Sequence, residues 1–179
     1  MKAWLYRRLA VRGPVAVGER FHVGPGTRIW APRRLSIGDD VYIGKFGTIE
    51  VDGEIGDGVL IANNVGIVGR RDHDQHEIGR AMSLSTWVGD DPDRLSDPVM
   101  VGSDVWIGYG AVVLSGVSVG RCSVIAAGAV VASDVPENSI VAGVPGRVVG
   151  RRFDPEAFER HVAALEAQGM RMHVGAGRP

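Results

Sequence analysis

The sequence is poor in several residue types and patterns, and each shortage excludes a class of protein. Its 179 residues contain one cysteine, Cys122, so an intramolecular disulfide is excluded and the position is expected to fill a small core or turn site. No apolar run is long enough for a membrane span, because arginines interrupt the only candidate, MKAWLYRRLAVRG. A formal net charge of −1 gives no electrostatic case for nucleic acid. We therefore expect a cytoplasmic protein with no transmembrane segment.

Several nucleotide-binding and redox motifs are missing as well. The chain has no phosphate-binding P-loop, no dinucleotide fingerprint and no CxxC pair. Its 26 glycines do not form such motifs, and many of them recur instead at fixed places in a repeat. The glycines are therefore read as corner residues of that repeat.

The repeat is clearest between residues 101 and 136, where the chain has a period of six. The blocks read VGSDVW, IGYGAV, VLSGVS, VGRCSV, IAAGAV and VASDVP. Each block begins with Val or Ile, and its fifth residue is small or β-branched. Short strands and tight turns repeated in this way wind into a solenoid, whose stacked coils bury one another's apolar side chains. Gly102, Gly108 and Gly120 suit corners that need a positive φ or a close backbone approach.

The same period runs backward from residue 72 to residue 17, with a two-residue break at Leu35 and Ser36. Three coils precede residue 72 and two follow residue 100, so five coils are expected. Residues 73–100 lack the period, and irregular segments of this length are uncommon unless they carry function. The predicted organisation is a lead-in at 1–16, a solenoid domain at 17–150 with a loop insertion at 73–100, and a C-terminal helix and tail at 151–179.

The C-terminal helix has a clear start. Asp154 supplies an acceptor side chain, and proline follows at the first helical position. Phe158, Val162 and Leu165 recur at helical spacing before Gly169. This helix is predicted to cap the solenoid, and the tail beyond Met170 is expected to be mobile.

His73 is the strongest catalytic candidate because it lies where the regular coil gives way to the long loop. A neutral imidazole suits general-base chemistry near neutral pH. The flanking Asp74, or a backbone carbonyl, could fix its tautomer. His76, three residues on, is the alternative base, or it lines an acceptor pocket or faces solvent.

The chain resembles the hexapeptide-repeat acyltransferases, of the type that includes maltose, galactoside and colanic-acid-type exopolysaccharide acetyltransferases. The resemblance covers residues from about 17 to 152 and is most specific in VWIGYGAVV and VIAAGAVVASDVPENSIVAGVPGRVV. It implies an all-β fold, a left-handed parallel β-helix with three hexapeptides per coil, and a homotrimer. It also implies that His73 is the catalytic histidine, that Asp74 orients it, and that acetyl-CoA is the cosubstrate with no metal.

The resemblance further implies residues for both substrates. For coenzyme A these are Trp106 and the small corner residues Gly108, Ala126 and Ala127. The basic residues Arg147 and Arg151, after the last coil, are the candidates for its phosphates, and Arg152 supports them. Where many relatives have Thr-Lys, this chain has Ala132-Ser133, which leaves a phosphate contact to be supplied elsewhere. For the acceptor, Glu50 falls near the family's acidic position, Asp52 competes with it, and His76 is a further candidate.

The expected function is transfer of an acetyl group from acetyl-CoA to a saccharide hydroxyl of an exopolysaccharide or cell-surface glycan precursor. Three alternatives stay open: N-acetylation of a nucleotide-linked amino sugar, acetylation of serine, and a trimeric scaffold without catalysis. A γ-type carbonic anhydrase shares the solenoid but needs three converging zinc-binding histidines. His22, His161 and His173 lie too far along the chain from His73 and His76 to complete that set.

Overall fold

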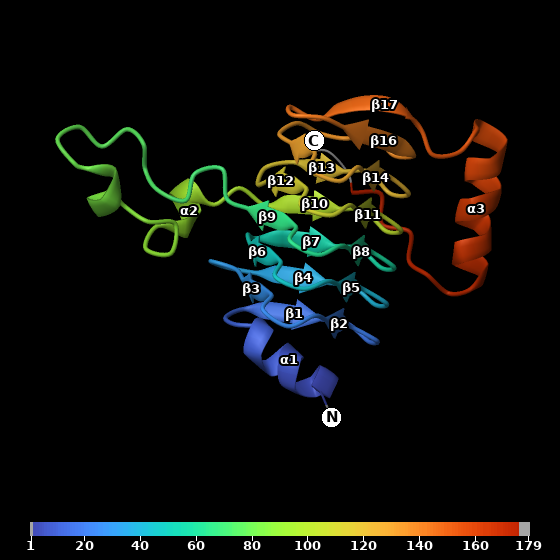
Figure 1. Cartoon of the computed structure of the whole chain (residues 1–179), viewed down its shortest axis with the longest axis horizontal. Helices are drawn as coiled ribbons and strands as arrows, with labels where there is room; N and C mark the ends of the chain where they lie inside the picture. Colours follow the sequence, from blue (N-terminus) through green and yellow to red (C-terminus); the bar gives the residue numbers. More distant parts are fainter. Residues whose placement is uncertain (1, 176–179) are drawn as a thin grey trace.

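The protein is a parallel β-helix, as a computed structural model shows (Figure 1). The structure describes residues 2–175, and side chains from residue 6 onward. Three sheets run along the solenoid: sheet 1 has the order β1-β4-β7-β10-β13, sheet 2 the order β17-β16-β14-β11-β8-β5-β2, and sheet 3 the order β15-β12-β9-β6-β3. Each coil contributes one strand to each sheet, so the expected five complete coils are confirmed.

The strands follow the predicted repeat closely. The first coil contains β1 (Val15–Val17), β2 (His22–Val23) and β3 (Arg28–Trp30), and the second contains β4 (Leu35–Ile37), β5 (Tyr42–Ile43) and β6 (Thr48–Glu50). The third contains β7 (Gly53–Ile55), β8 (Leu60–Ile61) and β9 (Gly66–Val68), and the fourth contains β10 (Val99–Val101), β11 (Trp106–Ile107) and β12 (Val112–Leu114). The fifth contains β13 (Ser118–Val119), β14 (Val124–Ile125) and β15 (Val130–Val131), followed by β16 (Ser139–Ala142) and β17 (Arg147–Arg151). β17 runs antiparallel to β16 and ends sheet 2.

The core consists of the residues that lead the hexapeptides. Ile107, Val113, Val119 and Ile125 are fully buried, and so is Ile67 one coil below. Each such side chain contributes roughly 1.5–3 kcal/mol on burial, which is why β-branched residues recur at this position. The fifth-place residues are buried as well, and they fill the corners between the sheets.

Close backbone approach and a positive φ, the two reasons expected for glycine at a corner, apply to different positions of the corner. A Cβ on Gly108 would lie 2.7 Å from the Ala127 nitrogen of the next coil, so close backbone approach requires glycine there. The positive φ occurs two residues later, at Gly110, with φ 65°. Only the close-approach position requires a small residue, because the equivalents of Gly110 in the second and third coils are Phe46 and Asn64, which have φ 56° and 58°.

Helix α1 (Lys2–Ala10) covers the N-terminal end of the solenoid (Figure 1). Ala10 is buried there and Tyr6 packs against the core, whereas Leu9 is exposed. The sequence pattern predicts no secondary structure for this lead-in. Its arginines do not prevent a helix, because they face away from the apolar contact in a short amphipathic turn.

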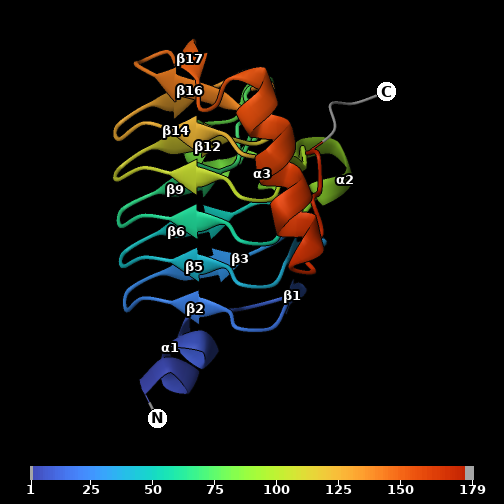
Figure 2. The same cartoon turned by 90° about the vertical axis from the view of Figure 1, so that its right-hand side faces the viewer.

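Helix α3 (Pro155–Ala167) begins where the sequence predicts. The side chain of Asp154 accepts a hydrogen bond from the Ala157 nitrogen at 2.7 Å, and Phe158 and Val162 are buried. The helix does not lie across the end of the solenoid. It runs down the flank, beside the turns that join sheet 1 to sheet 2 (Figure 2).

The segment after α3 returns along the same flank and packs in register. The Arg171 guanidinium contacts the buried Asp57 with Nε at 2.9 Å, and the Ser103 nitrogen donates to the His173 carbonyl at 3.0 Å. Residues 171–175 were expected to be mobile. The expectation is wrong for these residues because Asp57 offers a buried carboxylate to Arg171, and residues 176–179 lie outside the described chain.

Candidate active site

The long loop leaves the solenoid after β9 and projects well beyond it before returning to β10 (Figure 1). Its root is a short antiparallel ladder in which His73 pairs with Trp87. The Asp74 nitrogen donates to the Thr86 carbonyl at 2.9 Å, and the Val88 nitrogen donates to the Asp72 carbonyl at 2.8 Å. The outer part contains η1 (Met82–Leu84), and α2 (Pro92–Leu95) leads back. The ladder fixes the backbone at the predicted catalytic position.

His73 is half-buried, and its ring contacts a backbone carbonyl. Its Nδ1 lies 3.3 Å from the carbonyl oxygen of Ser85, a residue that is itself buried. Donation from Nδ1 to this oxygen stabilises the tautomer in which Nε2 is the basic nitrogen. The ring is thus arranged to accept a proton at Nε2.

Asp74 binds groups other than the His73 ring. Its carboxylate accepts hydrogen bonds from the Arg94 guanidinium and, at 2.8 Å, from the His76 nitrogen. The hydrogen bond from Arg94 and the one from His76 lower the pKa of the Asp74 carboxyl. Asp74 therefore ties α2 to the loop root, and its orienting role toward His73 stays a prediction. Arg94 was not foreseen, because twenty residues of irregular loop separate the pair in sequence.

His76 points away from the loop. Its side chain is 90% exposed, and its Nδ1 lies 3.8 Å from Asp74. Of the two places considered for this histidine, a pocket wall or the solvent, the structure has it in solvent.

Glu50 and its competitor Asp52 lie in different environments. Glu50, on the outer face of β6, lines a cavity of about 320 Å³ next to the loop root. Asp52 is buried and accepts hydrogen bonds from the backbone nitrogens of Arg33 and Arg34 and, at 2.5 Å, from Ser96 Oγ. Burial alone would raise the pKa of Asp52, but these hydrogen bonds outweigh it and lower the pKa. Asp52 holds a turn and the loop's return, and the acceptor-side role of Glu50 stays a prediction.

The candidate coenzyme A residues lie on sheet 2 and at its corner with sheet 3. Trp106 faces outward from β11 and is half exposed. Gly108 is buried, Ala126 is half-buried and Ala127 is exposed at the turn. Within residues 2–175, no backbone hydrogen bond uses the Ala127 nitrogen as donor. The Ala127 N–H is available to a ligand carbonyl.

The basic candidates after the fifth coil divide into two groups. Arg147 and Arg151 are exposed on β17. Arg152 instead forms an ion pair with Asp104 at 2.7 Å and lies over the Phe153 ring, so it fastens the chain rather than offering a free cation. Arg70 was not foreseen: its Nη2 donates to the Ala132 carbonyl at 2.7 Å, which places a guanidinium at the Ala132-Ser133 segment.

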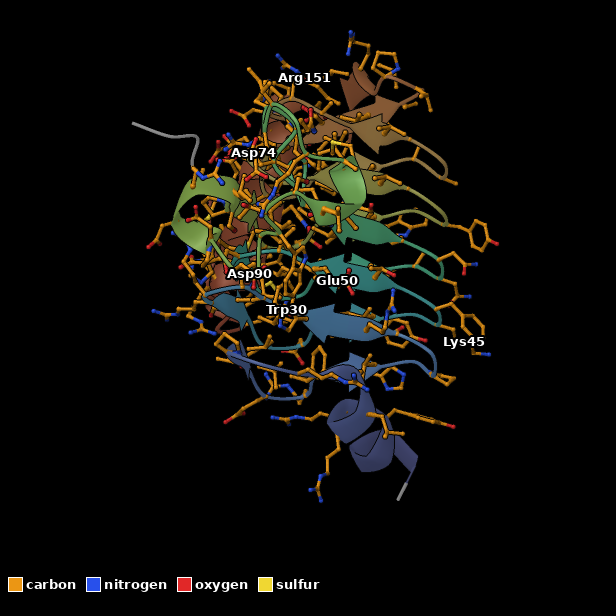
Figure 3. All side chains as sticks on the ribbon, turned by 90° about the vertical axis from the view of Figure 1, so that its left-hand side faces the viewer. Trp30, Lys45, Glu50, Asp74, Asp90 and Arg151 are labelled. Carbon is orange, nitrogen blue, oxygen red and sulfur yellow. The ribbon has the colours of Figure 1, made fainter. Side chains whose placement is uncertain are left out.

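A single chain keeps the two halves of the predicted site apart. The corner turns that contain Lys45, Asn63, Tyr109 and Ala127 stack on one another at the edge between sheets 2 and 3. His73 follows β9 at the opposite edge of sheet 3. In Figure 3 the labels of Lys45 and Asp74 lie on opposite sides of this sheet, with Glu50 between them.

One cluster in the described chain has the composition of a metal site. Asp104, Cys122 and His161 place potential ligand atoms within 4.8 Å of one another. Asp104 already binds His161 Nε2 at 2.8 Å as well as Arg152. The cluster lies between α3 and the solenoid, remote from His73, and its contacts are those of a structural clasp.

Comparison with known proteins gives consistent results. The family model for bacterial transferase hexapeptides (six repeats) matches residues 98–133. Galactoside O-acetyltransferase from Escherichia coli is 36% identical over 71% of this chain and 62% of its own length. A probable acetyltransferase from Mycobacterium tuberculosis is 34% identical over 84% of this chain and 49% of its own length. The chain thus spans about half to three fifths of these relatives.

Solved structures agree on the fold. A hexapeptide-repeat acetyltransferase from Vibrio cholerae, complexed with acetyl coenzyme A, aligns with a TM-score of 0.61 and 28% identity, covering 78% of this chain and 72% of its own. An N-acyltransferase from Bacillus cereus aligns with a TM-score of 0.60 at 20% identity, covering 87% and 82% of the two chains, which shows the fold alone. No helix in residues 2–175 has both the length and the hydropathy needed to cross a bilayer. The repeat, the three-sheet solenoid and these matches make the chain similar to the hexapeptide-repeat transferases, whose family model matches residues 98–133.

Proposed function

We propose that the protein is an acetyl-CoA-dependent O-acetyltransferase acting on a saccharide hydroxyl. The observation that carries the proposal is the placement of His73. Its ring is anchored through Nδ1 on the Ser85 carbonyl, at the root of a loop beside the cavity that Glu50 lines. The similarity to a galactoside O-acetyltransferase supports a saccharide as the acceptor class, and the Vibrio cholerae complex supports acetyl-CoA as donor. We place the reaction in the cytoplasm, where acetyl-CoA is made.

The proposed mechanism is direct transfer. Nε2 of His73 removes the proton from the acceptor hydroxyl while the oxygen attacks the thioester carbonyl. The tetrahedral oxyanion is stabilised by a backbone N–H, for which the exposed Ala127 turn is the candidate. The C–S bond then breaks, and the imidazolium returns its proton to the leaving thiolate. No covalent enzyme intermediate is required, which agrees with the absence of a reactive cysteine: Cys122, the only one, is buried.

Coenzyme A is proposed to lie along the stacked corners between sheets 2 and 3. The small side chains of Ala126 and Ala127 leave room for the pantetheine arm, and Gly108 lets its coil approach the backbone of these two residues closely. Arg147 and Arg151 are the phosphate-binding candidates, since guanidinium groups donate in a fork that fits phosphate oxygens. Arg70, which donates to the Ala132 carbonyl, is a further candidate cation near the position where the resemblance implies a lysine.

The proposed assembly is a homotrimer, because a single chain separates His73 from the coenzyme corner. Sheet 2 offers a surface for it: Tyr42, Leu60 and Trp106 follow one another in register on its outer face and are 45%, 45% and 52% exposed. Apolar rows of this kind are typical of contacts between copies of a chain. A second copy packed there would bring its own loop toward the coenzyme corner of the first.

Two other functions remain as alternatives to this proposal. An amine acceptor would use the same histidine, and the Bacillus cereus structure is an N-acyltransferase complex that shares the fold. A scaffold without catalysis would leave the anchored His73 unexplained. Both are distinguished by the assay below.

The test is release of free coenzyme A from acetyl-CoA with a panel of hexoses, oligosaccharides, amino sugars and nucleotide sugars. With a saccharide acceptor, we expect His73→Ala to reduce kcat about 10²–10⁴-fold, the range typical of losing a general base. His173→Ala, which alters an exposed histidine of the tail, is the matched control and should keep wild-type activity. His76→Ala serves as the second comparison.

The outcomes separate the alternatives. If His73→Ala is as active as the wild type while His76→Ala is not, the base is assigned wrongly. If only amines are acetylated, the enzyme is an N-acetyltransferase. If no acceptor releases coenzyme A and acetyl-CoA does not bind, the scaffold alternative replaces the proposal.

A further inference from the structure

The cavity beside the loop root is assembled from three segments that are distant in sequence. Its floor is the outer face of sheet 3, with Arg28 and Trp30 from β3 and Glu50 from β6. One wall is the loop root, with Asp72 and Trp87. The end of α1 and the residues after it close the remaining side, with Ala10 and Arg12.

Two tryptophans give the cavity an aromatic wall. The rings of Trp30 and Trp87 are stacked with centroids 5.4 Å apart and an interplanar angle of 12°. Trp87 nevertheless remains 42% exposed, a large fraction for an indole that is held by a stacking partner and a backbone ladder. A rigid, exposed indole is a surface on which the C–H face of a sugar ring can pack.

Charged groups stand beside the aromatic wall. Glu50 is the direct strand partner of Trp30, and its Oε1 lies 3.7 Å from Arg28 Nε. Asp72 extends the acidic side, and burial together with the Glu50 charge raises the pKa of its carboxyl. Carboxylates accept hydrogen bonds from sugar hydroxyls, and Arg12 and Arg28 can donate to hydroxyl or ring oxygens. The two carboxylates and two guanidinium groups balance in formal charge, which fits a neutral ligand.

The size of the cavity limits the ligand. A volume of about 320 Å³ is at the small end of the roughly 300–1,000 Å³ found for small-molecule sites. This volume fits one ring rather than an extended oligosaccharide. The cavity also adjoins the candidate base, because Asp72 precedes His73 in the chain and Trp87 is the ladder partner of His73.

We propose that this cavity binds one neutral pyranose unit of the acceptor, with the ring packed on Trp87 and its hydroxyls hydrogen-bonded to Glu50 and Asp72. The inference rests on the proposed function, and it adds the residues that select the acceptor. The loop root then has two tasks: it anchors His73 through Ser85, and it holds the sugar through Trp87. A phosphorylated or uronic acid ring is disfavoured because the charges of the lining residues already balance and leave no net positive charge to bind an anion.

The test measures sugar binding without catalysis. Saturation-transfer difference NMR is recorded for the wild-type protein, without acetyl-CoA, against methyl glycosides of glucose, galactose, mannose and N-acetylglucosamine. We expect saturation of the ring C–H protons for at least one glycoside. Trp87→Ala should weaken its affinity at least tenfold, and Glu50→Gln, which is isosteric, should weaken it severalfold. Leu84→Ala, an exposed apolar residue of the same loop, and Glu54→Gln, an exposed carboxylate on sheet 1, are the matched controls.

The outcomes separate this inference from the proposed function. Binding that is retained in both Trp87→Ala and Glu50→Gln, or no binding by any glycoside, overturns the inference. Circular dichroism of each variant checks that the fold is kept, and the isosteric Glu50→Gln is decisive if Trp87→Ala does not fold. Glycoside binding that depends on Trp87, in a protein that releases no coenzyme A, would keep the binding site and reject the acetyltransferase.

Discussion

The burial and reactivity of a single residue in this fold depend on its position within the coil. Cys122 is in a turn with a φ of 58° and no exposed surface, packed under Phe158 of α3. Burial, and then the charge of Asp104, raises the pKa of the thiol to about 12. The sequence-based expectation of a small core or turn residue is confirmed.

The first prediction concerns this thiol. In the native protein at pH 8, Cys122 should not react with Ellman's reagent, because the reactive species is the thiolate and both burial and the raised pKa suppress it. Absorbance of the released product is followed in buffer and in guanidinium chloride, and one thiol per chain should appear only after unfolding. Rapid reaction of one thiol in native buffer would mean that α3 does not cover the residue in solution.

At the scale of elements, the sixfold period predicted strands and the loop, while contacts across long sequence separations went unpredicted. Ile107 and Val113 are buried because their hexapeptide position faces inward in every coil, so the sequence period alone predicts their burial. The placement of α3 is not in the pattern. The position of α3 depends on the packing of its apolar face against Cys122. It also depends on the contact between His161 and Asp104, which are 57 residues apart in the chain.

The candidate site divides in the same way. His73 was predictable, because it marks the point where the period stops. Trp30 and Trp87 were not, since an irregular loop brings one to the other and no spacing rule relates them. Ser85 and Arg94 were missed for the same reason, although the loop they belong to was identified as functional.

The N-cap of α3 provides a prediction at this scale. Asp154→Ala removes the acceptor for the Ala157 nitrogen and should destabilise the helix by about 1 kcal/mol. Hydrogen exchange of the amides in the first two turns of α3 should accelerate about fivefold. Glu159→Ala, an exposed change within the same helix, is the control and should leave these rates nearly unchanged. Equal rates in the Asp154 variant and the wild type would show that packing alone holds the helix start.

At the scale of the whole molecule, the separation of His73 from the Ala127 corner leads to the proposal that active sites form between copies. Light scattering should give three times the chain mass of 19.0 kDa. Leu60→Glu places a charge in the middle of the apolar row on sheet 2 and should release smaller species, whereas Ala163→Glu on the exposed side of α3 should not. A monomer that is fully active would contradict the trimer and the shared site together.

The sharpest test of a shared site is to mix two inactive variants. His73→Ala lacks the base, and Ala127→Trp blocks the coenzyme corner with a bulky side chain at an exposed position. We assume that each site combines the loop of one copy with the coenzyme corner of the next. After dissociation and random reassembly, a site is intact only if the first copy has an unmodified His73 and the second has an unmodified Ala127. Each condition is met in about half of the cases, so about one quarter of the sites are intact. The equimolar mixture should therefore regain about a quarter of the wild-type rate. Unmixed variants carried through the same dissociation are the control. If the mixture stays inactive while wild-type protein recovers fully after the same treatment, both halves of the site come from one chain. The loop would then have to fold back across sheet 3 to reach the coenzyme.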